Sequence, residues 1–171
     1  MSTEITTDRL VLRPVHASDA GRITDLVNDP RIYRMVSRIS ANQTVAQTLA
    51  WISSHEAGRV DDTKHPYAIV EDGELVGVTS AHRDGTWLPF EIGYWLSPER
   101  WGKGLMTEAT EALMDWLKQR GEHSFISGYL ADNPASGRVL EKLDFMKAGR
   151  MNVFCLGRGE MVGHVNMARI D

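Results

Sequence analysis

The stretch that decides the fold is Glu91-Ile-Gly-Tyr-Trp-Leu-Ser-Pro-Glu-Arg-Trp-Gly-Lys-Gly-Leu-Met-Thr-Glu-Ala. It predicts a strand, a loop and a long helix over 105–120, because apolar residues recur at helical spacing there. Gly102 and Gly104 let the loop backbone approach a ligand closely, and the N–H groups of a helix's first turn attract negative charge. With Arg100 and Lys103 adding positive charge, the stretch predicts a phosphate-binding loop. The alternative is a glycine loop that only turns the chain.

Two common phosphate-binding folds are excluded by the spacing. A dinucleotide-binding fingerprint needs a third glycine where Thr107 stands. A P-loop needs Gly-Lys followed by Ser or Thr, and Gly104 stands in that place. The predicted strand over 90–96 also closes an antiparallel meander instead of opening a βα unit. A different class of phosphate-binding fold is therefore indicated.

The meander upstream consists of three predicted strands, over 67–71, 74–83 and 90–96. Asp72-Gly73 and Asp84-Gly85 separate them, and Asp-Gly between β-prone runs is typical of type I′ hairpins. The sequence therefore predicts three neighbouring antiparallel strands.

The flanking segments alternate between strand and helix patterns. Residues 5–13 predict one strand ended by Pro14, residues 20–27 a helix stopped at 28–30, and residues 44–57 a helix closed by Gly58; residues 31–40 have no clear pattern. Downstream we expect a strand over 123–130, a helix over 135–143, and a closing strand pair, 153–156 and 162–170, around 157–159. This order predicts a single α/β (α+β) domain over residues 1–171, in which helices flank a mixed, mostly antiparallel central sheet.

Composition limits the classes of function. The 171 residues carry a formal net charge of −4, with 42% hydrophobic and 25% charged residues, so we expect no nucleic-acid partner. The one cysteine, Cys155, excludes an internal disulfide and is expected to be a buried apolar residue. Neither a signal peptide nor a membrane-spanning run is recognisable, which predicts a cytoplasmic protein without membrane contact.

Four motifs in this order resemble the GNAT superfamily of acyl-CoA-dependent N-acetyltransferases, in particular its RimJ/RimL-type branch. They are Thr7-Asp-Arg-Leu-Val-Leu-Arg-Pro, Tyr67-Ala-Ile-Val with Gly73-Glu-Leu-Val-Gly, Trp101-Gly-Lys-Gly-Leu-Met-Thr-Glu-Ala, and Asn133-Pro-Ala-Ser-Gly-Arg-Val-Leu-Glu-Lys-Leu-Asp-Phe. Trp101 and Met106 depart from the general superfamily loop, and Asp144 stands where a glycine is usual. Asp tolerates the left-handed backbone that such a turn needs.

The resemblance implies a GNAT-type sheet that bulges and splays at the strand over 91–96, and a coenzyme A site beside it. Tyr94, Trp95 and Leu96 would offer backbone groups to the pantetheine arm, and Asn133 would reach the pantetheine amide. Ser136 would reach the thioester sulfur. The implied pyrophosphate loop comprises Trp101, Gly102, Lys103, Gly104, Leu105, Met106 and Thr107.

The implied reaction assigns two catalytic residues. Ser136 would protonate the departing thiolate, and Glu91 would act as the base for the incoming amine through water. Two alternatives stay open: Asn133 could only cap a helix, and Glu91 could be a solvated residue opposite a cation. No metal site is predicted, because Arg59 stands where a zincin-like pattern beginning at His55 needs its second histidine.

The function implied is acetyl transfer from acetyl-CoA directly to a primary amine, either a small molecule or a protein N-terminus. A non-catalytic acyl-CoA-binding module is the alternative, and a homodimer stays open. A structural partner protein that uses the closing strands for dimer contacts would leave the glycine loop unexplained. The acceptor would be selected by the loops over 31–43 and 84–89. Arg31, Arg34, Arg38 and Trp87 suggest cationic and aromatic walls there.

Overall fold

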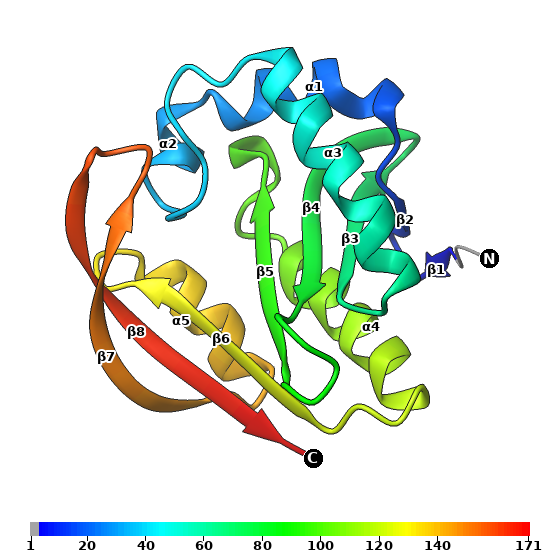
Figure 1. Ribbon diagram of the computed structural model, residues 1–171, viewed down its shortest axis with the longest axis vertical. Coiled ribbons are helices and arrows are strands. Elements are labelled where there is room, and N and C mark those ends of the chain that lie inside the picture. The colour runs from blue at the N-terminus through cyan, green and yellow to red at the C-terminus, as the bar shows by residue number, and fades with distance from the viewer. Residues whose placement is uncertain (1–3) are drawn as a thin grey trace.

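The computed structural model describes residues 4–171 and shows one open sheet of eight strands with helices on both faces (Figure 1). The strand order is β1-β2-β3-β4-β5-β6-β8-β7. The strands are β1 (Ile5–Thr6), β2 (Val11–Pro14), β3 (Lys64–Glu71), β4 (Glu74–His82), β5 (Phe90–Leu96), β6 (Ser124–Leu130), β7 (Met146–Cys155) and β8 (Glu160–Ile170). The helices are α1 (Ala20–Val27), α2 (Pro30–Tyr33), α3 (Val45–Val60), α4 (Leu105–Gln119) and α5 (Pro134–Lys142), with short 3-10 turns at Ala17–Asp19 and Pro98–Arg100.

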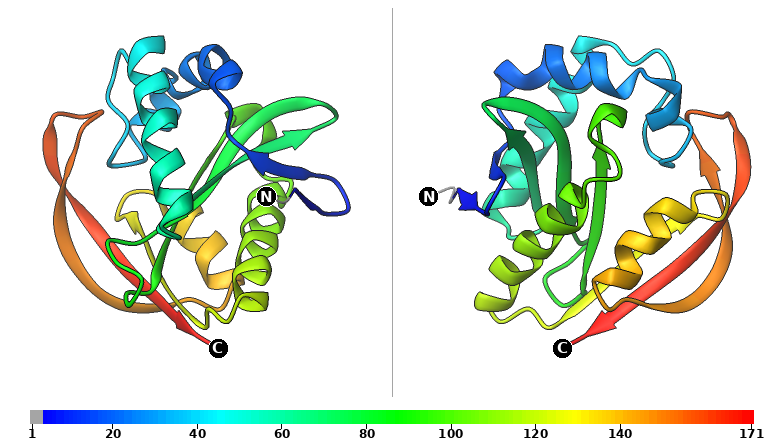
Figure 2. Two further views of the ribbon diagram at one scale, coloured as in Figure 1. Left: turned by 45° about the vertical axis from the view of Figure 1, so that its right-hand side comes forward. Right: turned by 180° about the vertical axis from the view of Figure 1, so that it is seen from behind.

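Helices α1 and α3 cover one face of the sheet and α4 and α5 the other (Figure 2), and each face has its own core. Tyr67 and Ile69 of β3 pack in the core that contains the buried faces of α4 and α5, whereas Ala68 packs in the core of α1 and α3. Successive side chains of a strand point to opposite faces, so a continuous apolar run is what a strand covered on both sides needs. The predicted α/β class and the flanking helices are confirmed.

The sheet opens between β5 and β6, which are its only parallel neighbours among the described strands. They pair at Phe90 with Phe125 and at Glu91 with Ile126. Beyond this point the Ser127 hydroxyl donates to Ile92 O at 2.7 Å, and the strands then diverge (Figure 1). The predicted splay is confirmed. The predicted bulge in residues 91–96 is wrong: β5 pairs with β4 in continuous register, and an irregularity lies instead at Ile69/Val70 between β3 and β4.

Several element boundaries differ from the prediction. Residues 5–13 form a hairpin, β1 and β2, because the Thr7 hydroxyl accepts from the Leu10 N–H and closes a turn. Helix α3 runs through Gly58, whose missing side chain leaves room for Lys64. Asp72-Gly73 has the predicted positive φ values, but Asp84-Gly85 does not, and β4 and β5 are joined by a longer loop. Strand β7 begins at Met146, earlier than predicted.

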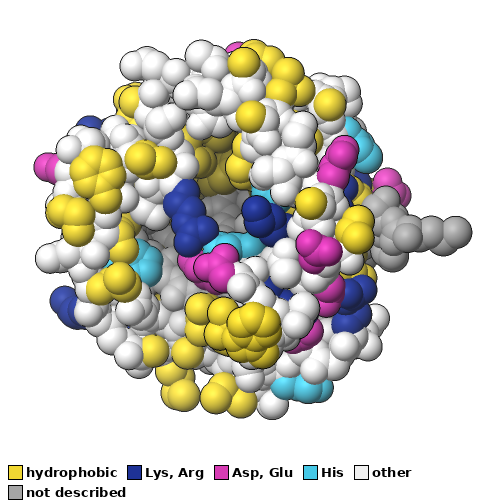
Figure 3. All heavy atoms as spheres, viewed as in Figure 1, with side chains coloured by type: hydrophobic (Ala, Val, Ile, Leu, Met, Phe, Trp, Pro, Cys, Tyr) yellow, Lys and Arg dark blue, Asp and Glu magenta, His cyan; other side chains and the backbone are white. Residues whose placement is uncertain are grey.

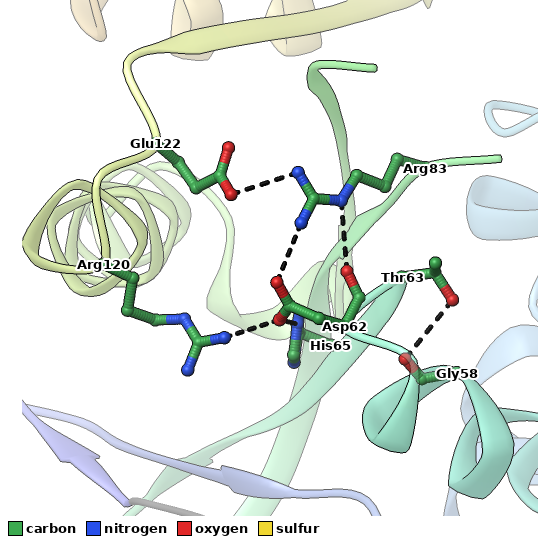
Figure 4. Close-up of polar contacts among 7 residues, drawn as sticks. All are labelled: Gly58, Asp62, Thr63, His65, Arg83, Arg120 and Glu122. Carbon is green, nitrogen blue, oxygen red and sulfur yellow. Dashed lines mark hydrogen bonds and ion pairs between the residues drawn. The ribbon is translucent and has the colours of Figure 1, made fainter. Parts of the chain in front are cut away.

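A charge network around the buried Arg83, which we call the Asp62 cluster, joins the turn after α3 to the ends of β4 and α4 (Figure 4). Arg83 donates to Asp62 at 2.8 Å and to Glu122 at 3.0 Å, and Asp62 also contacts Arg120 and His65. Burial would raise the pKa of Asp62, but the hydrogen bond with His65 and the nearby guanidinium charges hold it below its usual range. The cluster fixes one end of the central strands.

No helix within residues 4–171 has both the length and the apolar character that a membrane crossing requires.

Candidate active site

The loop before α4 has the backbone that the two glycines predict. Gly102 and Gly104 have φ values of +75° and +77°, in the left-handed region that glycine adopts without strain. The first N–H of α4 with an acceptor is that of Glu108, which donates to Gly104 O at 3.1 Å. The preceding N–H groups of the first turn are therefore free for a ligand. This helix end is a suitable site for an anion.

A cavity of about 490 Å³, here called the loop cavity, lies against this helix end and continues between β5 and α5. No added atom at Gly102 would meet protein within 4 Å, and one at Gly104 would meet only Arg9, at 3.6 Å. The glycines therefore border open space that a ligand can enter. Leu105 and Met106 are buried in the core, so they can offer a ligand only their backbone N–H groups.

The charge of the loop cavity favours an anionic ligand. Its described lining residues include four cations and no acid: Arg31, Arg100, Arg138 and Lys142. Arg31 pairs with Asp29 and Glu99, and Arg100 pairs with Glu71. By contrast, Arg138 and Lys142 have no ion-pair partner within residues 4–171. One turn apart on α5, they provide positive charge that is available to phosphate groups.

Most of the predicted coenzyme residues line the loop cavity together. They are Tyr94, Trp95, Leu96, Trp101, Gly102, Gly104, Leu105, Met106, Thr107, Asn133 and Ser136. Lys103 lies outside the lining; its carbonyl oxygen accepts from Arg9, which is also ion-paired with Glu108. Arg9 is a site residue that the sequence did not reveal, because it lies 95 positions before Gly104 in the chain. Arg138 and Lys142 were also missed, although their i, i+4 spacing after Asn133 was a usable signal.

Asn133 has the capping role that was left open. Its side chain accepts from the Ser136 N–H at 3.4 Å and donates to Met35 O at 3.3 Å. It therefore both starts α5 and holds the loop after α2 against it. Its predicted contact with the pantetheine amide stays a prediction.

A second cavity of about 530 Å³, here called the sheet cavity, opens over the other side of the splay. Figure 3 shows a hollow on this face, with acidic, basic and histidine side chains around it. Glu91 is the one acidic residue among its described lining residues. Of the four residues predicted as its cationic and aromatic walls, only Arg38 lines the cavity. Arg31 lines the loop cavity, Arg34 lines neither, and Trp87 is 82% exposed; the tryptophan in the wall is Trp51.

Five residues line both cavities: Met35, Val36, Tyr94, Trp95 and Ser136. The Tyr94 hydroxyl donates to Ser136 O at 2.9 Å and lies 3.0 Å from Ser136 Oγ. Burial raises the pKa of the Tyr94 phenol, so it keeps its proton across the physiological range. Tyr94 was predicted only for its backbone. The two hydroxyls form a proton-bearing pair where the cavities meet.

Glu91 lies on the floor of the sheet cavity beside two positive or protonatable groups. His82 Nε2 is 3.1 Å from Glu91 Oε2, and Arg38 Nη2 is 3.4 Å from the same oxygen. The hydrogen bond with His82 lowers the pKa of Glu91, and Arg38 acts in the same direction, while burial opposes them. The carboxylate is therefore ionised at neutral pH. The alternative of a residue opposite a cation is thus also observed.

Cys155 is fully buried, and its thiol lies 3.7 Å from Val36 O. Within residues 4–171, no group of three or more potential metal-binding side chains is brought together.

An anion-binding helix end and a proton-bearing pair between two cavities define an enzyme that transfers a group from a phosphorylated carrier. Comparison with known proteins specifies the class. Residues 9–146 match the family model described as "Acetyltransferase (GNAT) domain", so the chain belongs to the GNAT acetyltransferase family. It is therefore an acetyltransferase of this family.

Two relatives cover most of the chain. The ribosomal protein uS5-alanine N-acetyltransferase of Escherichia coli (strain K12) is 27% identical over 171 residues, covering 94% of this chain and 87% of the relative. The probable N-acetyltransferase YjcK of Bacillus subtilis (strain 168) is 30% identical over 154 residues, covering 84% and 85%.

Solved structures share the fold. RimL, a ribosomal L7/L12 alpha-N-protein acetyltransferase, superposes with a TM-score of 0.87 at 24% identity, covering 100% of this chain and 96% of RimL. Its complex with coenzyme A gives a TM-score of 0.86 at 23% identity, covering 98% of each chain. The sheet order and the splay are thus those of this fold.

Proposed function

We propose that the protein transfers the acetyl group of acetyl-CoA directly to the N-terminal amine of a protein, with both substrates bound at once. The observation that carries this proposal is the shared wall of the two cavities. Tyr94 and Ser136 line both, so a thioester that enters from the loop cavity meets an amine that enters from the sheet cavity. Proximity of this kind supplies a large part of an enzyme's rate enhancement.

The residues around the loop cavity would hold the coenzyme. The N–H groups at the start of α4 suit the pyrophosphate, and Arg138 and Lys142 suit a further phosphate. β5 pairs with β6 only as far as Glu91, so the backbone of Tyr94, which faces the splay, suits an amide of the pantetheine arm. The backbone of Trp95 is instead directed at β4, where it pairs with Val78, and Leu96 O accepts from Trp101 Nε1 at 2.8 Å.

The chemistry needs a neutral amine and a proton for the thiolate. The Glu91 carboxylate attracts the incoming ammonium and takes part in its deprotonation. The Ser136 hydroxyl, held by Tyr94, donates a proton as the C–S bond breaks. The departing thiolate has a conjugate-acid pKa near ~8.5, so this donation is helpful without being indispensable.

The acceptor class is supported by the relatives. The E. coli relative is named for an alanine of ribosomal protein uS5, and RimL is named an alpha-N-protein acetyltransferase of ribosomal L7/L12. The sheet cavity holds a single described carboxylate, Glu91, and it opens on the surface of Figure 3, as a polypeptide end requires. A short N-terminal segment fits a cavity of this size.

The proposal is tested by following thiol release from acetyl-CoA with peptides that begin with Ala or Ser. The same peptides with a blocked N-terminus are the matched controls, and free amino acids, amino sugars and polyamines form the competing panel. We expect turnover only with free N-terminal amines. Exclusive turnover of a small amine would overturn the acceptor class, and coenzyme binding without any thiol release would favour a binding module.

Direct transfer is tested at Cys155, the one thiol of the chain. Because Cys155 is buried and points at a backbone oxygen, Cys155→Ala should keep turnover and the intersecting kinetic pattern of a ternary complex. Ping-pong kinetics with acetylated Cys155 in mass spectrometry would contradict this expectation.

A further inference from the structure

Three ionisable side chains form a row across one face of the sheet. In the strand register Lys64 pairs with His82, and His82 pairs with Glu91. Directly opposed residues of antiparallel strands point to the same face, and all three line the sheet cavity. The cavity floor therefore presents an imidazole beside the carboxylate, and the proposed function gives that imidazole no role.

Arg38 contacts both His82 and Glu91. Its Nη1 lies 2.7 Å from His82 Nε2, and its Nη2 lies 3.4 Å from Glu91 Oε2. Arg38 comes from the loop between α2 and α3, and its side chain is 69% exposed, whereas that of His82 is 25% exposed. A guanidinium group can only donate hydrogen bonds, so the neutral His82 accepts one from Arg38 at Nε2. Once protonated, the same nitrogen donates to Glu91 Oε2 at 3.1 Å.

The Arg38 guanidinium thus directs one N–H at the imidazole of His82 and another at the carboxylate of Glu91. A primary ammonium offers the same charge and the same donors. We propose that the acceptor's ammonium binds between His82 and Glu91 in place of the Arg38 guanidinium, and that His82 Nε2 takes its proton. The inference rests on the proposed function, and it assigns the role of proton acceptor to His82 instead of Glu91.

Basicity favours the imidazole over the carboxylate. General-base catalysis is most efficient when the base has a pKa near the working pH, and imidazole is the side chain whose ordinary pKa lies there. The pKa of Glu91 is lowered by the hydrogen bond that a protonated His82 donates to it, and the charge of Arg38 acts in the same direction, so the Glu91 carboxylate is a poorer proton acceptor. Once His82 is protonated, the Glu91 carboxylate stabilises the imidazolium at 3.1 Å.

The protons balance over the full reaction. The ammonium gives one proton to His82 Nε2, and the neutral nitrogen forms a bond to the thioester carbonyl carbon. The C–S bond breaks, Ser136 donates a proton to the thiolate, and the second proton of the nitrogen restores the hydroxyl through water. His82 then releases its proton to solvent, and the products are the acetylated amine and free coenzyme A.

Other charged or titratable groups face His82 from the packed elements. They are Arg38 from the loop and Glu91 from β5, which contact it, and Lys64 from β3, which pairs with it; His55 from α3 and His164 from β8 line the same cavity, whereas the ring of His65 packs against Phe90 and Trp116. Only Glu91 among them is acidic, so it is the group whose loss should move the pH dependence of the rate.

The test compares pH profiles of kcat/KM for an acceptor peptide in the wild type, His82→Gln and Glu91→Gln. We expect His82→Gln to lose ~100-fold or more and to flatten the profile between pH 5 and 8. Glu91→Gln should retain a profile whose midpoint moves to lower pH. The double variant should be no slower than His82→Gln, because the two residues act as a unit. His123→Gln, an exposed histidine outside the cavity, is the matched control.

Arg38 gives a test that is independent of turnover. If its guanidinium competes with the ammonium, Arg38→Gln should bind the acceptor peptide several-fold more tightly by calorimetry, without acetyl-CoA. Arg34→Gln, on the same loop but outside the cavity lining, is the control. Weaker binding in Arg38→Gln would mean that Arg38 contacts the acceptor, and would overturn its role as a stand-in for the ammonium.

The two proposals fail separately. No thiol release by the wild type with any peptide would remove the proposed function. Wild-type turnover with an unchanged pH profile in His82→Gln would remove only the role of His82.

Discussion

Gly104 shows how one backbone conformation determines whether a ligand can bind. It is the residue before α4, and its φ of +77° directs the first N–H groups of the helix toward the loop cavity. The space around its Cα is open apart from Arg9. A side chain here therefore acts through backbone strain and through the space it takes from a ligand.

Replacing Gly104 by Val should weaken coenzyme A binding by at least about 10-fold, because a β-branched residue resists the left-handed conformation. Calorimetric titration measures the effect. Gly121→Val is the matched control: Gly121 has a φ of +91° and open space around it, but lies at the other end of α4. Equal coenzyme affinity in folded Gly104→Val would contradict the assignment of the loop.

At the scale of elements, the decisive feature is the short junction between β5 and β6. Only two residue pairs join the strands, and the Ser127 hydroxyl extends the junction by bonding to Ile92 O. Ser127 is 7% exposed, so this carbonyl has little access to water. The hydroxyl thus compensates for a pair of strands that separate early.

Ser127→Ala should lower the free energy of unfolding by about 1 to 3 kcal/mol, since it leaves a buried carbonyl without its donor. Urea unfolding measures the change. Ser124→Ala on the same strand removes an exposed hydroxyl, and its effect should stay within about 0.5 kcal/mol. Equal losses in the two variants would show that the hydroxyl of Ser127 does not secure the junction.

Local signals predicted those elements that depend on local geometry. Asp72-Gly73 marks its hairpin because both residues adopt positive φ, and Asn133 marks the start of α5 because its side chain caps it. Gly58 was misleading, since its function is tertiary: it makes room for Lys64. Residues 5–13 were misread as one strand because the alternation of their side chains continues across a turn.

In the candidate site, too, only the residues that are close in sequence could be predicted. The glycine loop is contiguous in sequence and could be recognised, and eleven of the twelve residues predicted to bind the coenzyme line one cavity. His82 and Arg38 could not be linked to Glu91, because their contacts depend on strand register and on a loop without a pattern. Arg9 was missed for the same reason.

At the scale of the whole molecule, two histidines with lowered pKa values make stability depend on pH. Burial lowers the pKa of His55 to about 4, with Lys64 and Arg59 acting in the same direction, and burial also lowers the pKa of His65. In the unfolded chain both would take up a proton near pH ~6.5. Between pH ~6.5 and the lowered values, the unfolded state therefore binds more protons than the folded state.

The free energy of unfolding should consequently fall as the pH drops from about 6.5 toward 4. One proton bound only by the unfolded state changes it by at most ~1.4 kcal/mol per pH unit. The contribution of His55 should be smaller than this limit, because its side chain is partly exposed. Urea unfolding at several pH values should give a shallower dependence for His55→Gln than for the wild type. His123→Gln, which changes an exposed histidine, should match the wild type. An unaltered slope in His55→Gln would contradict the expectation.

The two-pair junction between β5 and β6 also has a consequence for heat resistance. The loop cavity is lined by β5 and α4 on one side of the junction and by α5, which packs on β6, on the other. A coenzyme in that cavity would contact both parts of the sheet and hold them together. At 100 times its Kd, a ligand specific for the folded state adds ~2.7 kcal/mol to stability. The melting temperature should therefore rise with the concentration of acetyl-CoA, so that the enzyme resists heat best when its acyl donor is abundant.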